Sequence, residues 1–116
     1  MNTIQSILQQ IKESPSTIQF ADVIAVVDQY YDFTPTTFTN GHVKNEAGQN
    51  SGSCKIFSFA KLHGLSQDET LACFGDYYRV DVLQHPSNTD HQNIRNFIEF
   101  GWNGIVFEDN ALRLRV

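Results

Sequence analysis

Cys54 is the side chain with the clearest chemical potential, because it follows Gly52 and Ser53 where a polar loop gives way to a helical pattern. A thiol in the first turn of a helix faces the positive end of the helix dipole, which stabilises the nucleophilic thiolate. His63 is nine residues further along the same predicted helix, roughly 13 Å along its axis, which is too far for a base. His91, beside Asp90, is the remaining candidate, so these two residues complete the catalytic hypothesis.

The order Gly52, Ser53, Cys54 resembles the nucleophile entry of papain-like cysteine enzymes. Those enzymes have an aromatic residue directly after the cysteine, where this chain has Lys55, and their histidine and asparagine come farther downstream than this chain extends. A packed, unreactive thiol is therefore the favoured interpretation. A thiol-dependent hydrolase or transferase that uses Cys54 with His91 and Asp90 is the alternative.

Two histidine and carboxylate pairs have the four-residue spacing that brings ligands together on one face of a helix. They are His42 with Glu46 and Asp81 with His85. Glycines bracket the first pair and argue against a helix there, and neither pair lies in a zinc motif. Because two ligands do not make a metal site, we predict no metal and no cofactor.

Asp90 and His91 also have an interpretation without chemistry. Thr89 and Gln92 have the spacing of a capping box, in which the two side chains close the first turn of a helix. Capping is the favoured interpretation of this segment, which nevertheless places two polar side chains at an exposed helix end.

The segment from Asn40 to Ser53 is rich in asparagine and glycine and almost free of apolar residues. A long polar loop inside a domain is often functional. We therefore expect it to line a polar recognition site together with the start of the last helix. The candidate binding residues are Asn45, Glu46, Gln49, Asn50, Ser53, Asp90 and His91.

Composition narrows the classes of partner. The chain has 116 residues, 13 acidic against 8 basic, and a formal net charge of −5 at pH 7, which argues against nucleic acid because phosphate contacts need clustered cations. Two cysteines fit a reducing compartment. No stretch matches a signal peptide or a membrane span, so we expect a cytoplasmic protein with no membrane partner.

Apolar spacing predicts a helix-rich α+β fold, with five or six short helices around one core in a single domain of residues 1–116 and a small C-terminal β-hairpin. Helices are expected over 3–13, 16–31, 54–62, 66–74, 77–84 and 89–100, with an extended edge segment over 33–39, a turn at Asn40 and Gly41, and the hairpin over 105–114. The expected core residues are Ile24, Val27, Phe57, Phe59, Phe74, Ile94, Phe97 and Trp102.

Three stretches together resemble the HopJ family: residues 45–57, 71–80 and 89–97. The resemblance covers nearly the whole chain. It implies a type III effector-type protein of bacterial origin, exported without a cleaved signal, and it carries no catalytic residues. If the chain is a genuine effector, the resemblance implies a host protein as its partner.

The sequence therefore favours a non-catalytic binding or interaction module, whose partner is an unidentified protein or a small polar ligand. Residues 1–12 are polar, amphipathic and free of acids, which suits an exported N-terminus. Their isoleucines also suit a helix docked on the core, and we expect this segment to be ordered.

Overall fold

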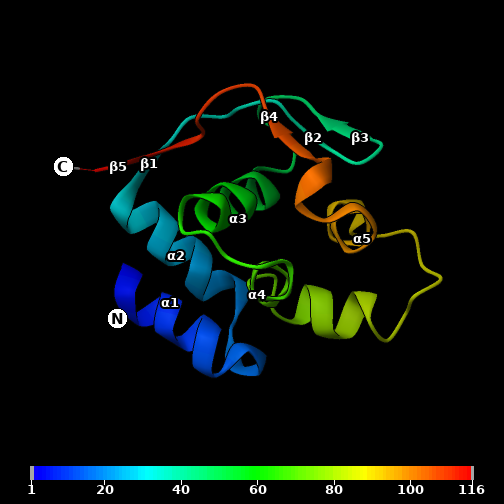
Figure 1. The fold of residues 1–116 in the computed structure, drawn as a ribbon, viewed down its shortest axis with the longest axis horizontal. Helices are drawn as coiled ribbons and strands as arrows, with labels where there is room; N and C mark the ends of the chain where they lie inside the picture. The colour runs from blue at the N-terminus through cyan, green and yellow to red at the C-terminus, as the bar shows by residue number, and fades with distance from the viewer. Residues whose placement is uncertain (1, 116) are drawn as a thin grey trace.

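The computed structural model describes residues 2–115 and has the predicted fold class, a helix-rich α+β domain (Figure 1). Two 3-10 turns, η1 (Pro15–Thr17) and η3 (Gly101–Gly104), and one π-helical segment, η2 (Tyr77–Val82), accompany the α-helices. The α-helices are α1 (Ile4–Glu13), α2 (Phe20–Tyr30), α3 (Ser51–Leu62), α4 (Gln67–Ala72) and α5 (Gln92–Phe100).

Local signals set the ends of α1 and α4. The side chain of Thr3 accepts from the Ser6 backbone at the start of α1, and Ser66 and Glu69 form the predicted capping box of α4. The fully buried Ile7 and Ile11 hold α1 against the core. The predicted N-cap of α2 is wrong, because Ser16 lies in η1 and the helix begins after Gln19.

Helix α3 is the centre of the core, with the short strands above it and α2 on its other side (Figure 1). Four of its side chains, Ile56, Phe57, Phe59 and Ala60, are fully buried. The predicted core is confirmed, except that Ile24 and Trp102 are only partly buried against it. The helix starts three residues before the predicted Cys54, so part of the expected loop belongs to it.

Within residues 2–115, five short strands form two antiparallel sheets. In one sheet β1 (Tyr31–Phe33) pairs with β5 (Leu112–Leu114). In the other the order is β3 (Val43–Asn45), β2 (Phe38–Asn40), β4 (Ile105–Phe107). The expected long polar loop is therefore shortened by β3.

The C-terminal strands lie where predicted, but they do not pair with each other as a hairpin. Strand β4 pairs with β2, where the rings of Phe38 and Phe107 stack 5.3 Å apart. Strand β5 pairs with β1, and the Thr34 backbone donates to the carbonyl of the buried Ala111 just before β5. Burial of these side chains favours pairing of each C-terminal strand with a strand that is distant in the sequence. Because β2 has a partner on both sides, the prediction of an edge segment over residues 33–39 is wrong.

The predicted helix over 77–84 is a π-helix, in which the Leu83 backbone donates to the carbonyl of Tyr78 at 3.0 Å. Gly75, just before it, has φ +60°, and a Cβ there would lie 2.8 Å from the backbone nitrogen of Phe20. Glycine is therefore required at this turn. π-helical segments recur at functional sites, and this one carries Asp81.

Within residues 2–115, no helix has the length and apolar character needed to cross a membrane.

Candidate functional site

A cavity of about 520 Å³ opens between the N-terminal ends of α3 and α5. Asn50 and Ser53 line it from the α3 side, and His91 lines it from the α5 side. The two segments that the sequence analysis assigned to one recognition site therefore meet at a single cavity. Its size is within the range of small-molecule sites.

Aromatic side chains form one wall of this cavity. The ring of Phe20 lies 6.3 Å from that of Phe74 and 5.2 Å from that of Tyr77, measured between centroids. The ring of Tyr77 is in turn 5.1 Å from the imidazole of His91. The cavity thus combines an apolar wall with polar helix ends, as ligand sites commonly do.

Both helices that open onto the cavity begin in the same unusual way. The residues before them, Asn50 and His91, each have φ +51°, and neither side chain accepts a hydrogen bond from the helix that follows. The predicted capping box at Thr89 is therefore wrong, because the side chain of Gln92 turns back and donates to the Thr89 carbonyl at 2.6 Å. The first-turn N–H groups of both helices lack a capping side chain, which leaves the positive ends of two dipoles beside one cavity.

A network of asparagine side chains holds these two helix ends on the β2–β3 pair. Asn93 of α5 accepts from the side chains of Asn40 (3.0 Å) and Asn45 (3.1 Å), and it donates to Asn45 at 3.0 Å. Asn50 donates to the same Asn45 oxygen at 2.7 Å. The predicted binding residue Asn45 is fully buried, so it positions the cavity and does not face it.

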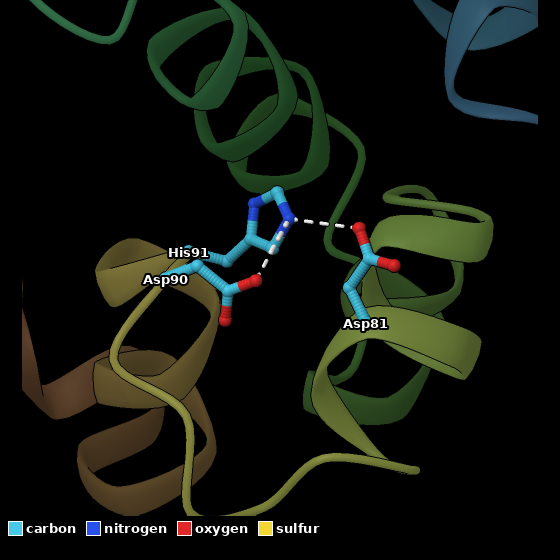
Figure 2. A group of neighbouring side chains, drawn as sticks. All are labelled: Asp81, Asp90 and His91. Atoms are coloured by element: carbon cyan, nitrogen blue, oxygen red, sulfur yellow. Dashed lines mark hydrogen bonds and ion pairs between the residues drawn. The ribbon is translucent and has the colours of Figure 1, made fainter.

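Asp81, Asp90 and His91 point toward one another beside the cavity (Figure 2). The Nε2 atom of His91 is 3.0 Å from Oδ2 of Asp81 and 3.9 Å from Oδ2 of Asp90. All three potential ligand atoms lie within 4.8 Å of one another, although Asp81 comes from η2 and the other two from the segment before α5. Such a group has the side chains for acid–base chemistry or for holding a cation.

Arg95 fixes the segment that carries Asp90. Its guanidinium donates to Oδ1 of Asp90 at 2.6 Å and to the Asp90 carbonyl at 2.6 Å. It also reaches the carbonyls of His85 (3.1 Å) and Pro86 (3.3 Å). The hydrogen bond from the Arg95 guanidinium to the Asp90 carboxylate is the main cause of the lowered pKa of Asp90. The Asp90 carboxylate therefore stays ionised.

Comparison with known proteins identifies the family. The chain matches the family model described as HopJ type III effector protein over residues 4–112. The chain belongs to the HopJ family. A crystal structure described as that of the unknown-function protein VPA0580 has 52% sequence identity to this HopJ chain and a TM-score of 0.96, and the match covers 99% of this chain and 95% of that one. No curated protein matches. Neither description supplies an activity, so the function of this HopJ chain has to be argued from its site.

Four of the seven predicted binding residues lie outside the cavity lining of the HopJ chain: the buried Asn45, Asp90 beside the cavity, Glu46 and Gln49. Glu46 forms an ion pair with Lys44 at 3.6 Å, and its backbone N–H donates to the side chain of Gln49 at 3.1 Å. Glu46 and Gln49 are both exposed and close the turn between β3 and α3. The sequence analysis missed Tyr77, Gln92 and Asn93, which do line the cavity, because only the fold brings them there.

The histidine and carboxylate pairs at four-residue spacing are not brought together in the HopJ structure. His42 lies in the turn between β2 and β3, and its ring packs on Phe100 of α5 with 4.8 Å between centroids, whereas His85 is exposed. Among residues 2–115, the one group of three metal-ligand side chains is Asp81, Asp90 and His91.

Cys54 of the HopJ chain is buried, with 2% of its surface exposed, and its thiol contacts the Thr36 carbonyl at 3.8 Å. Burial raises the pKa of Cys54, which opposes the thiolate expected at a helix start. Cys54 does not line the cavity that His91 lines. Cys73 is also buried, and its pKa is raised to about 12 by the same desolvation.

Proposed function

We propose that this HopJ chain is a non-catalytic binding module whose cavity between α3 and α5 holds a small polar ligand with an anionic group. The observation that carries the proposal is the cavity itself, of about 520 Å³, which Asn50 and Ser53 line from one segment and His91 from another. A concave site with an apolar wall and a few converging polar groups is the usual form of a small-molecule site.

The anionic group follows from the backbone around the cavity. The cavity is lined by residues from the first turns of α3 and α5, among them Ser53 and Gln92. In both helices the N-cap side chain accepts no hydrogen bond from the backbone N–H groups of the first turn, so these amides are uncapped. Backbone N–H groups at helix starts favour anions, and two such starts at one cavity act on the same ligand group. The aromatic wall suits an apolar portion of the same ligand.

A thiol-dependent hydrolase is not supported by a comparable observation. The thiol of Cys54 is buried, burial raises its pKa, and it lies outside the cavity lining. A nucleophilic cysteine needs a low pKa and access to substrate.

Family membership supports a further part of the proposal, that the protein is exported by a type III apparatus and meets its ligand in a host. Ile7 and Ile11 of α1 are fully buried, so the N-terminal helix must leave the core before the chain can be threaded unfolded.

A thermal-shift titration tests the cavity. Phosphate, citrate, glucose 6-phosphate and uncharged glucose are added to the purified chain, and we expect a saturable rise in Tm with anionic compounds and none with glucose. The Ser53→Phe variant fills the cavity and should abolish the rise. Ser51→Phe places the same side chain in the same helical turn at a residue outside the lining, and it should retain the rise. A rise that persists in Ser53→Phe, or no saturable rise with any anion, contradicts the proposal.

A further inference from the structure

We propose that Asp81, Asp90 and His91 bind a divalent first-row transition-metal ion at the edge of the cavity. Their three ligand atoms lie within 4.8 Å of one another, with Nε2 of His91 3.0 Å and 3.9 Å from the two carboxylate oxygens. Ligand atoms on one ion with bonds of about 2.1 Å are about 3.0 to 3.5 Å apart at octahedral or tetrahedral angles. Small side-chain rotations therefore close the triangle on an ion.

The ligand set selects the class of cation. Two carboxylates with one imidazole suit Mn²⁺, Fe²⁺ or Zn²⁺, whereas Mg²⁺ and Ca²⁺ prefer oxygen ligands alone. Asp81 and Asp90 are both about half exposed, with side-chain exposures of 44% and 48%, so water has access to the coordination positions that the protein leaves open.

The charges around the group favour an added cation. Asp90 is neutralised by Arg95, but within residues 2–115 Asp81 has no ion pair with a lysine or arginine, and its partner is His91. Arg95 occupies Oδ1 of Asp90 and leaves Oδ2 directed at His91, which is how an outer partner commonly orients a metal-ligating carboxylate. Arg95 also donates to the Asp81 carbonyl at 3.4 Å, so one guanidinium ties the two ligand-bearing segments together.

The cavity is a second and independent indication of a ligand at this place. His91 belongs to both features, since it is one of the residues that line the cavity and its Nε2 faces the carboxylates. An ion on Nε2 therefore lies at the cavity edge. It would offset the repulsion that two carboxylates exert on an anionic ligand. The metal site goes beyond the proposed function, because the ion is held by side chains alone and does not require an occupied cavity.

Mn²⁺ alone is the probe, because it has low affinity for thiols and its free ion gives an electron paramagnetic resonance signal that is lost on binding. We expect the wild-type chain to bind about one Mn²⁺, and Zn²⁺ to displace it in accordance with the usual order of metal affinities. The variants Asp81→Asn and His91→Asn should each lose at least about tenfold in affinity. Asparagine retains the shape of aspartate at residue 81 and tolerates the left-handed backbone at residue 91.

His85→Asn is the matched control, because His85 is a neighbouring exposed histidine outside the group, and it should bind Mn²⁺ like the wild type. Circular dichroism and Tm confirm that each variant is folded. Ser53→Phe should retain Mn²⁺ binding, which separates a failure of the metal site from a failure of the cavity proposal. The metal proposal is overturned if the folded wild type shows no saturable binding. It is also overturned if Asp81→Asn and His91→Asn both bind as tightly as His85→Asn.

Discussion

Asn93→Ala is the substitution that tests how the two helix ends are held together. Its side chain makes three hydrogen bonds to Asn40 and Asn45, and only 7% of the residue is exposed. A buried hydrogen bond contributes about 1 kcal/mol, and partners left without one add to the loss. We therefore expect the free energy of unfolding to fall by about 3 kcal/mol, a large share of the roughly 5–15 kcal/mol typical of a domain.

Urea unfolding followed by circular dichroism measures this loss. Asn96→Ala is the control on the same helix, because the Asn96 side chain makes one bond, of 3.3 Å, to the Asn40 carbonyl and should cost about 1 kcal/mol or less. A double-mutant cycle between Asn45→Ala and Asn93→Ala should give a coupling of at least about 1 kcal/mol. If Asn93→Ala is no more destabilising than Asn96→Ala, or the coupling is zero, the network does not hold the site.

Three further predictions concern other parts of the chain. Removal of residues 1–12 takes away two fully buried isoleucines and should lower stability by several kcal/mol, and an unchanged Tm would refute the docking of α1. Cys54 should resist iodoacetamide in the folded protein at pH 8 and react in urea, and rapid labelling of the native state would revive the thiol-enzyme hypothesis. Burial lowers the pKa of His63, so the unfolded state takes up a proton first as the pH falls through about 6.5. Stability should therefore decline between pH 7 and 5.5, and His63→Gln should flatten this decline in urea titrations.

Much of the fold could be predicted because its signals are local. The capping box at Ser66 and Glu69 and the buried face of α1 depend on neighbours three or four residues apart. The same holds for the burial of Phe57 and Phe97. Family membership could likewise be predicted from the sequence, because the resemblance extends over long stretches of the chain.

Errors arose where a local signal competes with distant packing. Thr89 to Gln92 has the spacing of a capping box, but His91 turns into a left-handed conformation beside Asp81 and becomes the residue before α5. The terminal strands have hairpin spacing, yet their apolar side chains find better partners in the N-terminal half. Local conformational propensities contribute only about 1 kcal/mol to the free energy of folding. The burial of aromatic side chains contributes more, so it decides which strands pair.

The sequence by itself determined the fold class, the family and the two polar segments that meet at the cavity. Only the tertiary structure decided which polar residues face the cavity. In the folded chain Asn45 is buried and supports the cavity from behind its lining, and Asp81 lies beside His91. The reason is physical: a ligand site is a set of distances between segments far apart in the chain. Those distances follow from how α3 and α5 pack on the strands, which no local spacing encodes.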